Sequence, residues 1–414
     1  MTLTAPAPGT TETKRYIPKF VSVDDHIIEP PNVWQDRLPA KYRDIGPRVE
    51  RLRVDNLQFN GMNYTFDIVD KNSTAGKFAD FWLYEDLQIP LRRIIAAVGF
   101  PIEERTLMPV TYDEMRKGCW DQTARLEDMD ANHTEMSLCF PTFPRFCGQT
   151  FTEAKDKELA LLCVKAYNDW MVEEWCGGAG AGRLIPLIII PLWDADLAAA
   201  EVRRNAARGV RAVCFSEIPP FLDLPSIHTG YWEPFFQACA DTDTVINMHI
   251  GSSSRMPATS PDAPAGVQAT LSFNNAMGSL ADWIFSGVLV RHPTLKLAYS
   301  EGQMGWIPYA LERAHSVWKD FRGWAFDTTA VPEPPEFYFR RQIFACFFRD
   351  NFGIKNLESI GVDNVTFETD YPHSDSTWPN TEQIFRDMVV DLSDEDVYKI
   401  ARGNALRMLS LPLD

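Results

Sequence analysis

The sequence predicts an α/β fold, and a (β/α)8 barrel is favoured over a doubly wound open sheet. Eight short apolar runs recur along the 414 residues, and helical segments separate most of them. The runs are continuously apolar rather than alternating, which is typical of strands buried on both faces of a parallel sheet. Eight such strands alternating with helices match a barrel of about 250 residues that carries insertions.

The predicted strands and helices follow one another along the chain. The strands cover residues 20–25, 136–141, 184–191, 210–215, 245–250, 295–300, 342–348 and 364–369. One predicted helix spans 194–208, because Asp194 can cap its first turn and Gly209 follows its end. The other predicted helices cover residues 231–240, 276–290, 306–319, 380–392 and 394–409.

Three segments interrupt this alternation. Residues 40–115 form an insertion after the first strand, with an expected hairpin around Asn60-Gly61 and a polar loop over 70–77. Residues 251–266 are rich in Ser, Pro, Gly and Ala, which is typical of a lid or binding loop and equally of a solvated surface loop. Residues 330–335 form a proline-rich loop. We expect a flexible arm over 1–15 and one domain over 16–414 that contains the 40–115 insertion.

Composition excludes several classes of partner. Forty basic and 57 acidic residues give a net charge of −17, without the basic cluster that nucleic acid or an anionic membrane requires. The most apolar stretch, 184–192, is too short to cross a bilayer of about 30 Å. The N-terminal sequence lacks the apolar run of a secretory signal. The eight cysteines form no CxxC pair, which indicates buried, reduced thiols and a cytoplasmic protein.

Polar side chains stand where the predicted strands end, which in a barrel is the mouth of the active site. Asp24 and His26 close the first strand and face the same way, because strand side chains alternate. His249 closes the fifth strand and Asp370 follows the eighth. Two imidazoles and two carboxylates suit a divalent cation such as Zn, Mn or Fe. Taken one at a time, each side chain could instead hydrogen-bond a neighbouring loop.

Other side chains are weaker candidates. Glu301 follows the sixth strand and could be a base, a further ligand or a carboxylate that orients a ligand. His373 could donate a proton or fix its own loop. Arg145, just past the second strand, could bind a substrate carboxylate or pair with a surface acid. Six aromatic residues could line a pocket or belong to the core: Phe81, Trp82, Tyr84, Phe140, Phe143 and Phe146.

Many segments in order resemble the amidohydrolase-related family of the amidohydrolase superfamily, the group that includes aminocarboxymuconate-semialdehyde decarboxylase. They include VDDHIIEPP, ARLEDMDANHTEMSLCFPT, YNDWMVEEW, GRLIPLIIIPLWDADLAAAEVRR, GVRAVCF, VINMHIG, SGVLVRHPTLKLAYSEGQMGWIPYALER, ETDYPHSDSTWP and GNALRML. The likeness covers roughly residues 18–410. It implies a (β/α)8 barrel with one catalytic divalent metal, whose ligands fall on Asp24, His26, His249 and Asp370.

Two departures from the family pattern bear on chemistry. Many members have His-x-His on the first strand, whereas Asp24 stands here, as in resorcylate-type decarboxylases. An acidic ligand favours Mn, Mg or Fe more than an all-histidine site would. Many members also carry a catalytic His after the sixth strand, where this chain has Glu301. His373 could take over that role.

The expected function is a metal-dependent hydrolase that acts on a small, aromatic or ring-derived molecule. A metal-bound water would attack, and Asp370 or Glu301 would take its proton. The alternative is a non-oxidative decarboxylase of an aromatic or unsaturated carboxylic acid. Further alternatives are a non-haem iron oxygenase component and a non-catalytic binding protein. One metal ion per chain is expected, zinc first and Mn or Fe otherwise. Relatives suggest a homodimer.

Overall fold

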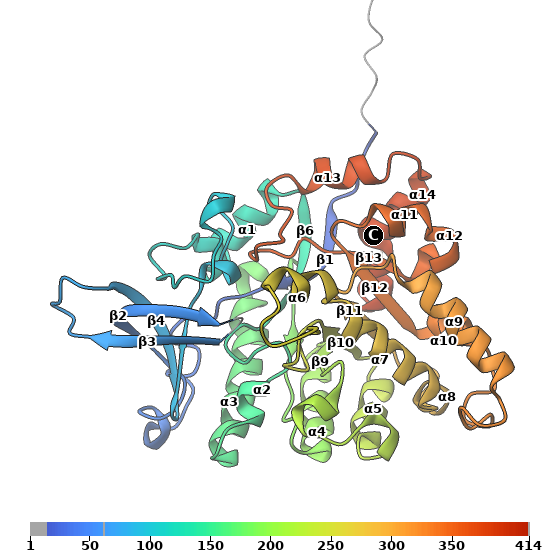
Figure 1. Cartoon of the computed structure of the whole chain (residues 1–414), viewed down its shortest axis with the longest axis horizontal. Helices are drawn as coiled ribbons and strands as arrows, with labels where there is room; N and C mark the ends of the chain where they lie inside the picture. The colour runs from blue at the N-terminus through green and yellow to red at the C-terminus, as the bar shows by residue number, and fades with distance from the viewer. Residues whose placement is uncertain (1–14, 61–62, 413–414) are drawn as a thin grey trace, which may run out of the picture.

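The computed structural model describes residues 15–60 and 63–412, and it shows a mixed α/β fold with parallel sheets at its centre (Figure 1). One sheet has the order β1 (Phe20–His26), β6 (Thr134–Phe140), β7 (Leu184–Ile185). The other has the order β13 (Val365–Phe367), β12 (Ile343–Phe347), β11 (Leu297–Ser300), β10 (Val245–His249), β9 (Ala212–Cys214), β8 (Leu187–Ile188). Every pairing within these two sheets is parallel.

The two parallel sheets adjoin at both ends. Only Pro186 separates β7 from β8, and proline has no N–H to donate to a ladder. At the other end, the backbone N–H of Asp370 donates to the carbonyl of Asp24 at 3.0 Å, just past the end of β13. Each of the eight predicted runs contains an observed strand, and the third run is divided at this proline.

Helices lie between and around the strands (Figure 1). They are α1 (Gln122–Ala131), α2 (Gln149–Thr152), α3 (Lys157–Trp170), α4 (Ala195–Ala206), α5 (Glu233–Asp241), α6 (Ala265–Leu271), α7 (Asn274–Phe285), α8 (Val288–Arg291), α9 (Ile307–Asp320), α10 (Pro335–Gln342), α11 (Asn351–Lys355), α12 (Leu357–Ile360), α13 (Thr381–Met388), α14 (Asp394–Tyr398) and α15 (Asn404–Met408). Two π-helical segments extend α3 and α14, η5 (Met171–Trp175) and η10 (Lys399–Gly403). Short 3-10 turns are η1 (Ala40–Tyr42), η2 (Arg93–Ile95), η3 (Ile102–Glu104), η4 (Lys117–Cys119), η6 (Gly178–Gly180), η7 (Pro219–Leu222), η8 (Ile227–Thr229) and η9 (Val362–Asn364).

Local sequence explains several helix boundaries. Asp194 caps α4 as expected, accepting hydrogen bonds from the N–H groups of Asp196 and Leu197 at 3.0 and 2.9 Å. The helix predicted over 276–290 is instead two helices, α7 and α8, because Gly287 adopts a left-handed φ of 75° between them. The predicted loop over 251–266 runs into α6, which begins at Ala265.

The insertion between β1 and β6 is more elaborate than the predicted hairpin. It contains a four-stranded antiparallel sheet, β3 (Asn63–Val69), β2 (Arg48–Asn60), β4 (Lys77–Tyr84) and β5 (Leu87–Pro90), which projects from the side of the molecule (Figure 1). β2 and β3 pair antiparallel as expected, but Gly61 of the predicted turn lies outside the described residues. The predicted arm over 1–15 also lies outside them, except for Arg15.

Aromatic packing joins this antiparallel sheet to the parallel strands. Trp82 of β4 stacks on Phe143 with ring centroids 4.9 Å apart, and Trp34 meets Trp82 edge-on at 5.1 Å. Trp82, Tyr84, Phe140 and Phe143 are buried. These predicted pocket aromatics therefore belong to the core, and the sheet is anchored at its base by ring contacts.

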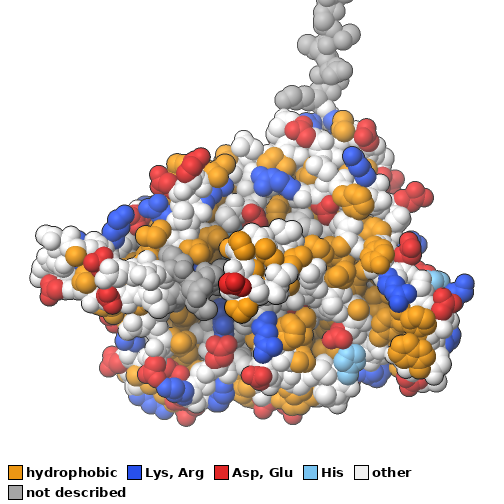
Figure 2. Space-filling model, viewed as in Figure 1, with side chains coloured by type: hydrophobic (Ala, Val, Ile, Leu, Met, Phe, Trp, Pro, Cys, Tyr) orange, Lys and Arg blue, Asp and Glu red, His pale blue; other side chains and the backbone are white. Residues whose placement is uncertain are grey.

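The surface and the thiols fit a charged protein with free cysteines. Figure 2 shows acidic and basic side chains intermixed over the visible face. Seven of the eight cysteines are buried and Cys176 is half-buried, all of them as free thiols. Within residues 15–60 and 63–412, no helix combines the length and the apolar character needed to cross a membrane.

Candidate metal centre

Four predicted ligands meet at the carboxyl ends of the parallel strands. Asp24 and His26 lie on β1, His249 is the last residue of β10, and Asp370 lies just past β13. All four are buried, with at most 1% of their surface exposed. Asp370 has a left-handed φ of 51°, a costly conformation for a residue with a side chain, and such conformations cluster at functional sites.

The four side chains point at one another. His26 Nε2 lies 3.3 Å from Asp370 Oδ1 and 3.6 Å from Asp24 Oδ1. His249 Nε2 lies 3.4 Å from Asp24 Oδ2. The ligand atoms of Asp24, His26 and His249 all lie within 4.8 Å of one another, close enough to surround one cation.

The facing atoms have no hydrogen-bond partner among the described residues. This holds for Nε2 of both histidines and for both carboxylate oxygens of Asp24 and of Asp370. The tautomer of His249 is defined, because its Nδ1 lies 2.6 Å from the carbonyl of Ile250, which can only accept. Nδ1 of His249 therefore carries a proton, and Nε2 is the ring nitrogen that faces the cluster and is placed to bind a metal. Buried polar atoms left unpaired in this way fit a cation site.

The pKa shifts of the clustered side chains also fit a cation site. Burial raises the pKa of Asp24 well above its usual range, and the neighbouring Glu368 and Asp370 carboxylates raise it further. Burial also raises the pKa of Asp370 and lowers the pKa of His26. The raised pKa values of the two carboxyl groups disfavour the ionised form that binds a metal, and a bound cation would lower them again. The lowered pKa of His26 favours the neutral imidazole that a metal ligand requires.

Glu301 and His373 join the cluster from neighbouring loops. Glu301 Oε2 lies 3.1 Å from His249 Nε2, and the Glu301 backbone has a left-handed φ of 56°. The His373 ring stacks on His26 with centroids 3.5 Å apart, and its Nδ1 lies 3.4 Å from Asp370 Oδ1. Burial lowers the pKa of His373 to about 3. The structure thus brings together six of the seven predicted site residues.

Arg145, the seventh, turns toward a different set of partners. Its guanidinium pairs with Glu153 and donates to Ser254 Oγ at 3.3 Å, in the loop that follows β10. Its neighbour Phe146 stacks on His249, with ring centroids 4.0 Å apart and an interplanar angle of 8°. Of the six predicted pocket aromatics, Phe146 is the one that covers a candidate ligand face to face. The role of Arg145 in holding a substrate stays a prediction.

A polar layer beneath the cluster holds β1 in place. Asp25 is buried and accepts hydrogen bonds from Ser22 Oγ, Thr369 Oγ1 and the Tyr371 N–H at 3.1, 2.6 and 3.0 Å, and one from Ser137 Oγ. The buried Arg125 guanidinium donates to the His26 carbonyl at 2.6 Å. These contacts fix the residue between the first two candidate ligands and the backbone carbonyl of the second.

Three buried side chains near the cluster were not predicted as site residues. Glu368 follows β13, Cys346 lies on β12, and Glu217 follows β9. Burial raises the pKa of Glu368 to about 8 and the pKa of Glu217 to about 7. The sequence could have identified the two glutamates as candidates, because each lies within three residues of the end of a predicted strand. Cys346 lies inside an apolar run, where a cysteine is ordinarily core.

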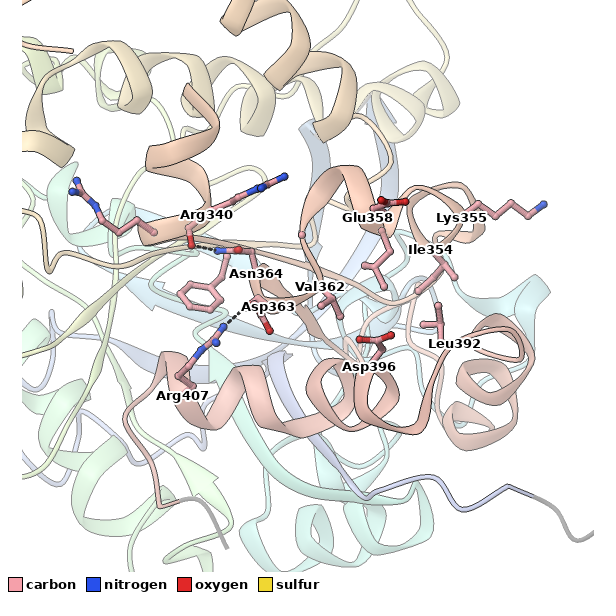
Figure 3. A pocket seen from close by; sticks show the side chains of 14 residues that line it. Arg340, Ile354, Lys355, Glu358, Val362, Asp363, Asn364, Leu392, Asp396 and Arg407 are labelled. Carbon is pink, nitrogen blue, oxygen red and sulfur yellow. Dashed lines mark hydrogen bonds between the residues drawn. The ribbon is translucent and has the colours of Figure 1, made fainter. Parts of the chain in front are cut away.

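A surface groove lies at the opposite ends of the strands. It has a volume of about 880 Å³ and is lined by residues just before β12 and β13, among them Arg340 and Asp363, and by Arg407 of α15 (Figure 3). Arg407 donates to the Asp363 carbonyl, and Asn364 donates to the Arg340 carbonyl at 3.1 Å. The groove is therefore remote from the metal-competent cluster, at the end of the strands that ordinarily serves stability.

Known proteins share this fold. The chain resembles an amidohydrolase from Mycobacterium avium subsp. paratuberculosis K-10, with a TM-score of 0.69, 19% identity and coverage of 95% of this chain and 99% of that one. It resembles 2,6-dihydroxybenzoate decarboxylase from Rhizobium, with a TM-score of 0.58, 17% identity and the same coverage. It also resembles 5-carboxyvanillate decarboxylase from Novosphingobium aromaticivorans DSM 12444, solved with bound manganese and 3-methoxy-4-hydroxy-5-nitrobenzoic acid, with a TM-score of 0.57, 19% identity and coverage of 71% and 83%.

Sequence comparison gives the family. Comparison of the sequence with curated proteins found no significant match. The family model described as amidohydrolase matches residues 71–411, which is most of the chain. The chain therefore belongs to the amidohydrolase family.

Proposed function

We propose that this enzyme is a metal-dependent, non-oxidative decarboxylase of an aromatic or unsaturated carboxylic acid. The observation that carries the proposal is the acidic ligand set, two carboxylates and two histidines with unpaired, converging atoms. It is supported by fold similarity to decarboxylases of dihydroxybenzoate and carboxyvanillate. We also propose that the parallel strands close into a (β/α)8 barrel, in one domain over 16–414 with 40–115 as an insertion.

The proposed ligands are Asp24, His26, His249 and Asp370. Manganese is preferred to zinc because half of this set is carboxylate and because one similar decarboxylase was solved with manganese. When bound, the metal supplies a positive centre for a substrate carboxylate and a neighbouring hydroxyl group. The iron oxygenase alternative stays a prediction that analysis of the bound metal would test.

The protein's own side chains would handle the proton. Glu301 is not one of the proposed ligands but lies 3.1 Å from His249, and its side chain is 15% exposed, so it can be reprotonated from solvent. It would give a proton to the ring carbon that bears the carboxylate. The bond between that ring carbon and the carboxylate carbon then breaks, its electron pair stays with the ring, and CO2 leaves without any oxidation or reduction. His373 would hold Asp370 and His26 in place. Phe146, against His249, would cover one side of the ligand cluster.

Hydrolysis is the second candidate, because the matched family is that of the amidohydrolases. In that reaction Glu301 or Asp370 would accept a proton from a water molecule instead of donating one to carbon. The same side chains serve both reactions, so only the substrate and the product distinguish them.

The test is product analysis with the metal-loaded enzyme. Dihydroxybenzoates and 5-carboxyvanillate are the probe acids, and we expect release of CO2 and, in heavy water, one deuterium at the vacated ring carbon. Glu301→Gln should lower kcat by about 10²- to 10⁴-fold with unchanged metal content, whereas Glu358→Gln, on the surface, should not. Hydrolysis of ester, amide or lactone probes with no CO2 from any acid would favour the second candidate. Unchanged kcat in Glu301→Gln would exclude Glu301 as the acid.

The homodimer and the cytoplasmic location remain proposals from the sequence. Light scattering of the purified protein tests the first, and fractionation of the source cells tests the second.

A further inference from the structure

A second group of metal-competent side chains lies beside the first. Asp24, Cys346 and Glu368 come from β1, β12 and the residue after β13, and their ligand atoms all lie within 4.8 Å of one another. Each side chain belongs to a residue with at most 1% of its surface exposed. The group shares Asp24 with the candidate metal centre, so a single carboxylate borders both sites.

Hydrogen bonding leaves this group incomplete. Both oxygens of Asp24 and Oε1 of Glu368 are buried without a hydrogen-bond donor among the described residues. The other oxygen of Glu368 accepts from the Glu301 N–H at 3.1 Å and from Cys346 Sγ. Two buried carboxylates side by side need either a shared proton or a cation between them.

Cys346 favours the cation. Its Sγ also lies 3.0 Å from the Tyr299 carbonyl, so the thiol is held at the edge of the carboxylate pair. A divalent metal would take the place of the thiol proton and would have the Cys346 sulfur and the Asp24 and Glu368 carboxylates as ligands. In tetrahedral geometry the sulfur and a ligating carboxylate oxygen would lie about 3.5 Å apart. Sulfur is a soft ligand, which selects zinc or cobalt over magnesium or manganese.

The balance of buried charge also favours a cation between Asp24, Cys346 and Glu368. One divalent cation offsets Asp24 and Asp370, and Asp25 faces Arg125 and four hydrogen-bond donors. The side chains that act most strongly on Glu368 are Glu301, Asp24 and the Cys346 thiol, none of which carries a positive charge. Charged carboxylates are rarely buried without a partner, because removing their charge from water is costly.

We propose that Asp24, Cys346 and Glu368 hold a second, thiophilic divalent cation, with Asp24 bridging it to the first. The proposal rests on the proposed function for the first centre. It makes the enzyme a two-metal protein in which the deeper ion is structural and fixes Asp24, while the outer ion faces the substrate.

Cobalt is the probe, because it binds zinc sites and reports sulfur ligation by a charge-transfer band in the near ultraviolet. The full-length protein is freed of metal and titrated with Co²⁺, and bound cobalt is counted by mass spectrometry. We expect two ions per chain and the sulfur band. Cys346→Ser and Glu368→Gln should each bind one ion and lack the band. Cys239→Ser, at a buried cysteine of α5, is the matched control and should behave like wild type. Circular dichroism verifies that each variant is folded.

One ion per chain in the wild type, without the sulfur band, would overturn the proposal, even if Cys346→Ser proved unfolded. CO2 release by that one-metal enzyme would leave the proposed function standing. Conversely, two bound ions with no decarboxylation of any probe acid would support the second site and contradict the proposed function. The two proposals therefore fail separately.

Discussion

Asp25 is the side chain that holds the candidate ligands in position without being one of them. Its carboxylate accepts four hydrogen bonds, from β1, from β6 and from the segment after β13. The nearby Arg125 lowers the pKa of Asp25 against the raising effect of burial. Because it ties together strands that are distant in sequence, loss of its charge should affect the fold before it affects chemistry.

We expect Asp25→Asn to lower the free energy of unfolding by about 2–3 kcal/mol, because an amide cannot accept every donor and the buried Arg125 loses its nearest counter-charge. Urea unfolding measures this. Asp320→Asn, at an exposed position in the last turn of α9, is the control and should change it by less than about 0.5 kcal/mol. Equal stabilities of the two variants would show that Asp25 is dispensable for the fold.

A buried glutamate, Glu217, helps to hold the segment after β10. Glu217 Oε1 accepts from the Gly251 N–H, Ser253 Oγ and Asn275 Nδ2, at 3.1, 3.0 and 3.1 Å. Its other oxygen has no hydrogen-bond partner among the described residues. The three donated hydrogen bonds favour the charged carboxylate, but burial favours the neutral acid more strongly. Glu217 therefore binds its proton more tightly in the folded protein than in the unfolded chain.

This gives a pH dependence of stability. Burial raises the pKa of Glu217 from 4.5 to about 7, so between these values the folded protein holds a proton that the unfolded chain releases. By linkage, the contribution of Glu217 to stability falls as the pH rises through this window, by at most about 3 kcal/mol. We expect Glu217→Gln, which mimics the neutral acid, to gain stability relative to wild type over this window in urea unfolding. Glu358→Gln should follow the wild-type curve. Parallel curves for Glu217→Gln and wild type would contradict the assignment.

Across the whole molecule, the strand ends gather negative charge that the protein alone does not neutralise. Asp24, Asp370 and Glu368 are buried together. Burial raises the pKa of each, and repulsion from the neighbouring Glu301 carboxylate raises it further. Such a cluster weakens the fold without metal and strengthens metal binding, a trade of stability for function that is common at active sites.

Metal removal should therefore destabilise the wild type. Manganese at about 100 times its Kd should raise the free energy of unfolding by about 2.7 kcal/mol over the chelated protein. Asp24→Asn should abolish this response and, without metal, should be at least as stable as the metal-free wild type, because it removes a buried charge. Thermal melts with and without chelator test both points. An undiminished manganese response in Asp24→Asn would exclude Asp24 as a ligand.

The sequence by itself determined the parallel strands and the main candidate ligands. Apolar runs and side-chain alternation are local properties, so the strand positions and the shared direction of Asp24 and His26 follow from neighbouring residues alone. His249 and Asp370 could be added because carboxyl ends of parallel strands share one edge. The hairpin of the insertion was predicted for the same local reason, although its two further partner strands were not.

Only the tertiary structure decided which side chains touch. That Phe146 stacks on His249, that Glu217 anchors the following loop and that Cys346 meets Glu368 beside Asp24 depend on the stagger of strands far apart in sequence. No periodicity encodes that stagger, because it results from packing over the whole core. The local sequence thus determines which side chains stand near the metal centre. The fold determines which partner each side chain contacts and how deeply it is buried, and hence its proton affinity.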